Sequence, residues 1–174
     1  MEIKVHRGLE QIGGCITEIS TETSRVFIDF GQNLPGYGVP TTPEEDEALV
    51  TQIFAQNKKE HEAVFYTHGH EDHVGLLEYI PEDVRQYMSE GTKGLLKIKN
   101  DVLYKGADLK VNELLENECD SQEYSDAMNR LIYADNKCKL LNKILVWKRT
   151  PPRKAPQSIC ISNIKVTPFF HCHS

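Results

Sequence analysis

A short apolar run followed at once by a cluster of histidines is the feature that most constrains this chain. Residues 63–66 read Ala-Val-Phe-Tyr, and the seven residues that follow contain three of the seven histidines. Neutral imidazole and carboxylate are the ligands that zinc and similar divalent ions prefer. An isolated His-x-His pair would fit an ordinary surface loop. Three imidazoles and an aspartate within six residues, directly after a strand-like run, indicate a metal site instead.

The spacing within this cluster fits two neighbouring ions. His68 and His70 are separated by one residue, so on a tight loop both side chains can chelate the same ion. Asp72 and His73 lie just beyond, where the backbone turns into a helix, and can point at a second ion. Two ions about 3.5–4 Å apart can hold a bridging hydroxide and polarise the bond to be cut. The Thr67 hydroxyl is placed to support one of the ligands.

Length and composition indicate one globular domain. The chain has 174 residues, of which 39% are hydrophobic and 26% are charged, and no apolar run approaches the length of a membrane span. Residues 1–6 lack the apolar core of a signal peptide. The five cysteines are scattered without Cys-x-x-Cys spacing, which is typical of reduced thiols. We therefore expect a cytoplasmic protein that does not enter a membrane.

The charge balance argues against a protein that binds nucleic acid nonspecifically. Twenty basic residues stand against 26 acidic ones, a net charge of −6, whereas such binders are usually basic. Local binding of phosphate remains open, because bound metal ions can supply positive charge. A small basic cluster could also touch a phosphate backbone, although a solvated loop is the favoured interpretation of it. It consists of Lys148, Arg149, Arg153 and Lys154.

The element pattern predicts a mixed α/β fold. Alternation and turn residues predict strands over 2–6, 15–20, 25–30, 62–66, 84–88, 143–148, 158–161 and 164–170. Helical spacing predicts a helix from Thr42 to about Gln56, a short helix from Asp72 or His73 through Tyr79, and helices over most of 92–141. We expect strands that carry ligands at their ends, with helices on the outside.

The histidine cluster resembles the metal motif of the metallo-β-lactamase superfamily. The resemblance rests first on residues 68–73, His-Gly-His-Glu-Asp-His. Three segments are similar in sequence to the ribonuclease J and related RNA-processing branch. They are residues 67–75, Gln-Ile-Gly-Gly at 11–14 and Phe-Ile-Asp-Phe-Gly at 27–31. Residues 1–80 and the last ten residues carry the resemblance, whereas residues 92–157 carry no motif of that family.

The resemblance implies a fold and a domain organisation. The fold is an αββα sandwich of which this chain would be the N-terminal half, with residues 92–141 as a helical insert. Residues 1–174 would then form a single incomplete domain. The family's bridging aspartate and last histidine would follow Ser174. Exposed strand edges and an uncovered apolar face would make such a half-domain self-associate.

The resemblance also implies a ligand set. His68 and His70 match ligands of the first ion, and Asp72 and His73 match ligands of the second. Asp72 would also orient the nucleophilic water, and Asp29 would support the metal loop from behind the ligands. Residues 167–174 resemble the segment that gives the third ligand of the first ion. His173, directly before Ser174, is the favoured ligand there, and His171 is the alternative. Two zinc ions are expected in a complete domain, and manganese can replace them.

Three functions follow as hypotheses. The first is a metal-dependent phosphodiesterase, of ribonuclease type, in which a metal-bound hydroxide attacks phosphorus and RNA is the partner. The second is hydrolysis of a thioester, lactone or other acyl compound by the same hydroxide. The third is a binding or assembly module that keeps the metal loop as structure. Because the ligand set is incomplete, we expect this chain alone to be weak or inactive as an enzyme.

Overall fold

The computed structural model describes residues 1–36, 40–116, 120–147 and 157–168. The chain forms two compact units. The sheet unit comprises Met1–Glu90 with Leu145–Ser174, and the hairpin unit comprises Gly91–Ile144. None of the helices in the described ranges is long and apolar enough to cross a membrane.

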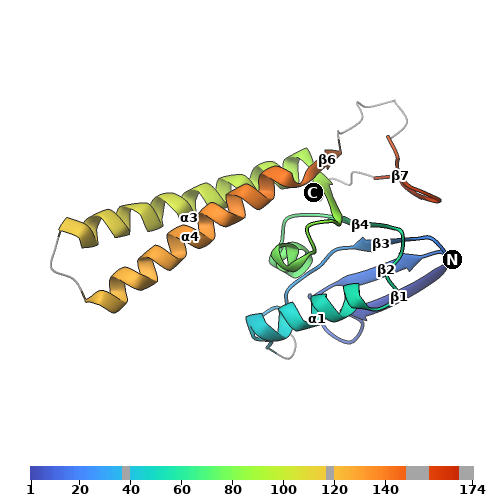
Figure 1. The fold of residues 1–174 in the computed structure, drawn as a ribbon, viewed down its shortest axis with the longest axis horizontal. Coiled ribbons are helices and arrows are strands. Elements are labelled where there is room, and N and C mark those ends of the chain that lie inside the picture. Colours follow the sequence, from blue (N-terminus) through green and yellow to red (C-terminus); the bar gives the residue numbers. More distant parts are fainter. Residues whose placement is uncertain (37–39, 117–119, 148–156, 169–174) are drawn as a thin grey trace. The chain divides into compact units, whose positions relative to one another are not determined.

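The sheet unit is built on a six-stranded mixed sheet in the order β1-β2-β3-β4-β5-β6 (Figure 1). Its strands are β1 (Glu2–Arg7), β2 (Ile16–Ser20), β3 (Ser24–Ile28), β4 (His61–Phe65), β5 (Arg85–Ser89) and β6 (Leu145–Trp147). β1, β2 and β3 pair antiparallel, whereas β3 to β6 are mutually parallel. The predicted mixed α/β fold is therefore confirmed.

The parallel register places the chain segments that follow β3 and β4 side by side. Ile28, the last residue of β3, pairs with Phe65, the last residue of β4. Because the two strands run in the same direction, the segments that follow them leave the sheet at the same edge. The loop that begins at Asp29 therefore lies next to the loop that contains the histidine cluster.

Each face of the sheet has its own apolar layer. On one face, Phe27 and Phe30 pack against Phe54 of α1 (Pro43–Ala55), with ring centroids 5.0 and 5.6 Å from the Phe54 ring. Successive strand residues point to opposite faces, so Val26 belongs to the other layer. That layer also holds Phe65 and packs on the antiparallel hairpin β7 (Ile159–Ile161) and β8 (Ile164–Val166).

α1 begins where the sequence predicts. The Thr42 side chain accepts a hydrogen bond from the Glu45 backbone N–H, and the Glu45 carboxylate accepts one from the Thr42 backbone N–H. This capping box satisfies two N–H groups that have no partner inside the helix. Pro43 takes the first helical position, where its missing N–H costs nothing.

A buried arginine closes the other end of α1. Arg25 of β3 is 1% exposed and donates to the backbone carbonyls of Ile53, Phe54 and Gln56 at 3.2, 3.2 and 2.8 Å. Its Nε also pairs with the Glu62 carboxylate of β4. A cation at a helix C-terminus is favourable because the last carbonyls are unpaired there. Arg25 thereby joins β3, β4 and α1.

The hairpin unit consists of two long helices, α3 (Glu90–Glu116) and α4 (Ser121–Lys143). The Asp120 side chain caps α4 by accepting from the Gln122 N–H at 3.1 Å. Val111, Leu114 and Ala127 form part of the apolar seam between the helices. The helical pattern predicted for residues 92–141 is thus observed. That this stretch is an insert into a larger domain remains a prediction.

Several predicted element ends differ from the structure. β3 ends at Ile28 rather than at residue 30, because Asp29 adopts a left-handed conformation with φ 62°. The short helix predicted through Tyr79 is split into α2 (Glu71–Val74) and the 3-10 turn Leu77–Tyr79. The last strand ends at Val166, and the remainder of the range predicted for it includes residues 169–170, which lie outside the described residues.

Candidate metal centre

The histidine cluster lies at the carboxyl edge of the parallel strands. It begins directly after β4, and its last part forms the single turn α2. Main-chain hydrogen bonds hold this turn from two neighbouring loops: Cys15 N to Asp72 O at 3.1 Å, Phe30 N to His73 O at 2.9 Å, Gln32 N to Glu71 O at 2.9 Å and Leu76 N to Phe30 O at 3.0 Å. The backbone that carries the candidate ligands is therefore fixed by the body of the sheet unit.

Two glycines allow these loops to approach each other closely. A Cβ on Gly31 would lie 1.6 Å from the Asp72 carbonyl oxygen, so a side chain there would displace the turn. Gly13 has φ +85°, and a Cβ on it would lie 3.0 Å from the Asp72 Cβ. Both the contact and the positive φ require glycine. Gly13 and Gly31, which lie in two of the motifs that carry the family resemblance, thus pack against the turn α2 at Asp72.

Asp29 joins β3 to the histidine cluster. Its Oδ1 accepts from the Thr67 backbone N–H at 2.7 Å, and its Oδ2 lies 2.8 Å from both the Thr67 hydroxyl and His73 Nδ1. An ionised carboxylate only accepts, so His73 donates to Asp29 through Nδ1, and its other ring nitrogen, Nε2, is directed toward Asp72. A carboxylate that orients a ligating imidazole in this way is a common feature of metal sites.

Thr67 fixes a second imidazole by the same reasoning. Its hydroxyl has one hydrogen, which it donates to Asp29. The His68 Nδ1, 3.0 Å from the hydroxyl oxygen, must then be the donor of that contact. His68 Nε2 is left with a lone pair, the form in which imidazole binds metal.

The separations within the cluster fit two ligand pairs. His68 Nε2 and His70 Nδ1 are 3.2 Å apart, and His73 Nε2 and Asp72 Oδ2 are 3.4 Å apart. Two ligand atoms on one tetrahedral zinc, at bonds of about 2.0–2.2 Å, lie about 3.3–3.6 Å from each other. The rings of His68 and His73 have centroids 3.9 Å apart, so the two pairs are adjacent. The residues present fit zinc as two pairs.

Neither pair is a complete ligand set. Within the described ranges, no group of three or more His, Cys, Asp or Glu side chains is arranged to hold one ion. His173, the third ligand that the sequence favours, and the alternative His171 lie outside the described residues. The proposed basic cluster of Lys148, Arg149, Arg153 and Lys154 lies outside them as well.

The surroundings favour the neutral imidazole at His68. Burial, followed by the nearby rings of His73 and His70, lowers the pKa of His68, although Asp29 and Asp72 act in the opposite direction. A ligand with a lowered pKa stays unprotonated at neutral pH and available to a metal.

Cys15 is a neighbour of the site that the sequence pattern did not reveal. Its backbone N–H bonds the Asp72 carbonyl. Burial raises the pKa of its thiol, and the charges of Asp29 and Asp72 add to that effect. The thiol therefore stays protonated at neutral pH, and this neutral form is a poor zinc ligand.

Arg7 is a second residue that pattern reasoning missed. Its Nη1 donates to Asp46 of α1 at 2.7 Å, its Nε donates to the Gly14 carbonyl at 3.3 Å, and its Nη2 donates to the Gly31 carbonyl. One guanidinium thus ties together α1 and the two glycine loops that hold the ligand turn. In the sequence Arg7 is only the polar end of an alternating strand, so no local signal marks it.

Comparison with known proteins gives no family for the chain. No family model matches it, and no curated protein matches it. Among the solved structures that match is the crystal structure of a protein of unknown function from Enterococcus faecalis V583. The two are 26% identical, with a TM-score of 0.47 over 57% of this chain. This chain spans 28% of the length of that protein.

Proposed function

We propose that the chain belongs to a metal-dependent hydrolase of the metallo-β-lactamase superfamily, with a phosphodiesterase of ribonuclease type as the leading activity. The observation that carries this proposal is the pairing of ligand atoms. His68 with His70 and Asp72 with His73 have separations of 3.2 and 3.4 Å, and Asp29 orients His73 from behind. The αββα sandwich is part of the same proposal.

The proposed chemistry assigns a role to each residue. His68 and His70 would hold one divalent ion, and Asp72 and His73 would hold another. When bound, such ions polarise the scissile group and lower the pKa of water. Asp29 keeps the His73 ring in the orientation that presents Nε2. The side chain of Asp72 is 18% exposed, so water reaches it, and its carboxylate can accept a proton from the attacking water.

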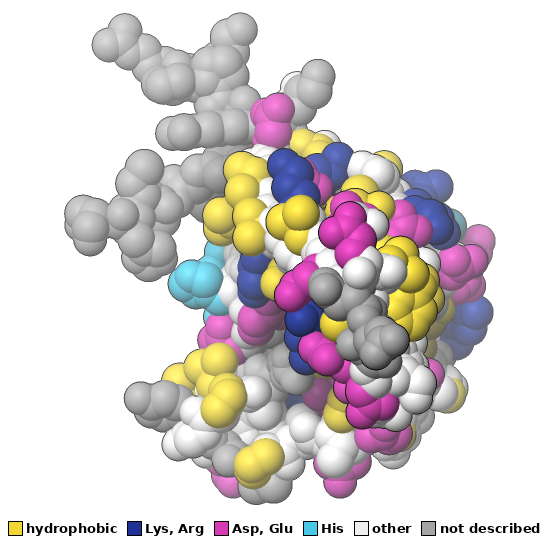
Figure 2. Space-filling model, turned by 90° about the vertical axis from the view of Figure 1, so that its left-hand side faces the viewer, with side chains coloured by type: hydrophobic (Ala, Val, Ile, Leu, Met, Phe, Trp, Pro, Cys, Tyr) yellow, Lys and Arg dark blue, Asp and Glu magenta, His cyan; other side chains and the backbone are white. Residues whose placement is uncertain are grey.

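A phosphodiester substrate is supported by the motifs at residues 11–14, 27–31 and 67–75, which resemble those of the RNA-processing branch. Among the described residues, acidic and basic side chains are interspersed in the view of Figure 2. On that face, therefore, phosphate binding would have to be local. Cations held at the site supply such local charge where the phosphoryl oxygens need it.

Hydrolysis of two model substrates tests the proposal. The chain, supplied with zinc or manganese, is assayed with bis(4-nitrophenyl) phosphate and with a simple thioester. We expect slow diester hydrolysis, which Asp72→Asn should abolish. Asp83→Asn is the control and should keep the activity, because the Asp83 side chain is exposed and forms an ion pair with Lys58. Equal rates in both variants would contradict the proposal. Turnover of the thioester alone would favour acyl hydrolysis instead.

A further inference from the structure

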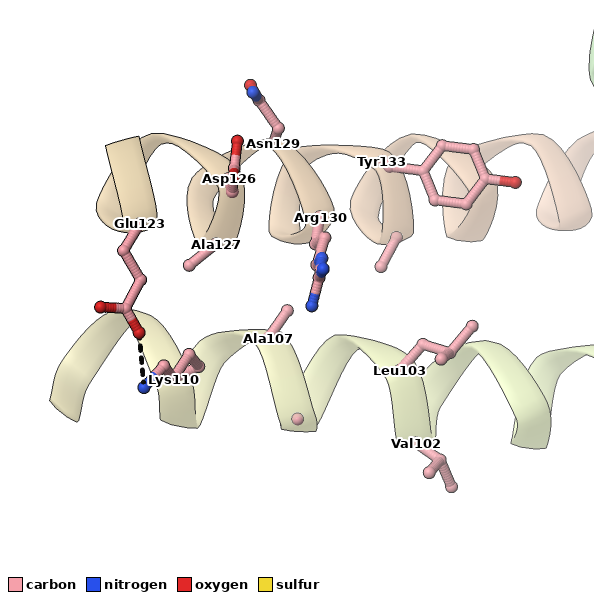
Figure 3. Close-up of a pocket in the computed structure, with 12 residues that line it drawn as sticks. Val102, Leu103, Ala107, Lys110, Glu123, Asp126, Ala127, Asn129, Arg130 and Tyr133 are labelled. Carbon is pink, nitrogen blue, oxygen red and sulfur yellow. Dashed lines mark ion pairs between the residues drawn. The ribbon is translucent and has the colours of Figure 1, made fainter. Parts of the chain in front are cut away.

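α3 of the hairpin unit has two apolar faces. One face packs on α4 and holds the buried residues Leu96, Ala107, Val111 and Leu114. The other carries four large side chains that are exposed: Leu95 (57%), Ile98 (64%), Val102 (66%) and Leu109 (69%). These four, called the outer stripe here, lie within an arc of about 60° on the side of the helix turned away from α4. Figure 3 shows Val102 pointing away from α4 and Ala107 pointing toward it.

The spacing of the outer stripe is that of a helix-packing seam. Its residues follow one another at i, i+3, i+7 and i+14, which is the heptad repeat by which two helices pack along their length. A helix that is apolar on two sides is normally covered on both. The stripe is about 21 Å long, at 1.5 Å of rise per residue.

The outer stripe is symmetric about Val102. Leu95 and Leu109 lie seven residues to either side of it. If a second α3 ran antiparallel with its Val102 against this one, Leu95 would face Leu109 of the second copy. Ile98 would then face Gly106, where nothing lies within 4 Å of the position that a Cβ would occupy. Large side chains would thus meet either each other or an open position.

The charges beside the stripe are complementary under the same symmetry. Asp101 and Lys105 lie along one edge of the stripe and carry opposite charges. Antiparallel pairing about Val102 brings Asp101 next to Lys105 of the second copy. This pair occurs twice, as a two-fold axis requires. Opposite charges flanking an apolar seam select a partner and its direction.

We infer that the outer stripe of α3 is a self-association surface, on which a second copy of this chain docks antiparallel about a two-fold axis at Val102. This surface belongs to the hairpin unit, whereas the candidate metal centre and the strands belong to the sheet unit. Because the stripe is short, the dimer is expected to dissociate in the micromolar range.

Sedimentation velocity on the full chain over that concentration range tests the inference. The wild type should approach twice the 19.9 kDa mass of one chain. Val102→Glu places two carboxylates against each other on the axis and should raise the dissociation constant at least about tenfold. Glutamate is a good helix former at an exposed position, so the helix content measured by circular dichroism should not change. Leu115→Glu is the matched control, because Leu115 is 64% exposed on the same helix but lies off the stripe.

A charge exchange tests the direction of pairing. Asp101→Lys should weaken the dimer, because it places a lysine beside Lys105 of the second copy, and adding Lys105→Asp in the same chain should restore it. A monomeric wild type would overturn the inference. An association that Val102→Glu leaves unchanged, as pairing through strand edges would give, would overturn it equally.

Discussion

Replacing Arg25 by methionine tests how the sheet unit is held together. Arg25 donates to three carbonyls at the end of α1 and pairs with Glu62, whose side chain is 6% exposed. Arg25→Met leaves this carboxylate buried without its partner. Breaking a buried pair from one side costs about 3–5 kcal/mol. We therefore expect the free energy of unfolding to fall by about 4 kcal/mol, a large part of the 5–15 kcal/mol typical of a domain.

Urea unfolding followed by tryptophan fluorescence measures this loss. Trp147 is the single tryptophan of the chain, and its ring stacks 5.4 Å from Phe65 in the sheet unit. Its emission therefore reports unfolding of that unit. The double variant Arg25→Met/Glu62→Met removes both charges and should recover about 2 kcal/mol or more relative to Arg25→Met.

An exposed pair is the control for the Arg25 variant. The side chains of Lys58 and Asp83 are 68% and 67% exposed, so Lys58→Met should cost less than about 1 kcal/mol. A loss below about 1 kcal/mol for Arg25→Met would refute the reasoning. So would a double variant that is no more stable than Arg25→Met.

Three further substitutions probe the loops and the start of α1. Gly31→Ala should lower zinc affinity at least about tenfold in an equilibrium titration, because its Cβ would collide with the Asp72 carbonyl; Gly94→Ala, with open space around it, should leave affinity unchanged. Asp29→Asn keeps the left-handed backbone that asparagine tolerates but weakens the support of the ligating imidazole. We expect a 10- to 100-fold loss of zinc affinity with unchanged circular dichroism. Thr42→Ala should cost about 1 kcal/mol in urea unfolding, and a cost near zero would contradict the capping assignment.

The sequence predicts most of the local structure of this protein because the signals are local. Thr42 and Pro43 mark the start of α1 within a few residues, and the capping box is observed. The strand that leads into the histidine cluster is predicted by its apolar run and observed as β4. In each case the hydrogen bonds and the apolar period lie within one short segment.

Contacts between distant segments could not be predicted in the same way. Arg25 and Asp46 are charged residues, which are normally exposed in a strand or a helix, yet both are almost completely buried. Their partners Glu62 and Arg7 lie 37 and 39 residues away. The early end of β3 has the same origin, because Asp29 leaves the strand to bond Thr67 and His73. Only the assembled sheet brings these groups together.

In the candidate site, too, the local features were predictable from the sequence and the contacts between distant segments were not. Which residues could bind metal was predicted from residues 68–73 alone, and His68, His70, Asp72 and His73 do lie together. The roles of Cys15 and Arg7 depend on loops that are far apart in the sequence, and no pattern marks them.

Elemental analysis of the metal bound per chain tests the central claim most directly. The wild type is compared with His68→Ala and with His61→Ala, because His61 lies at the start of β4 with its side chain 44% exposed. Zinc bound by the wild type, kept in His61→Ala and lost in His68→Ala, is the result that the proposed metal centre predicts. Absence of zinc from the wild type, or equal zinc in both variants, would contradict it.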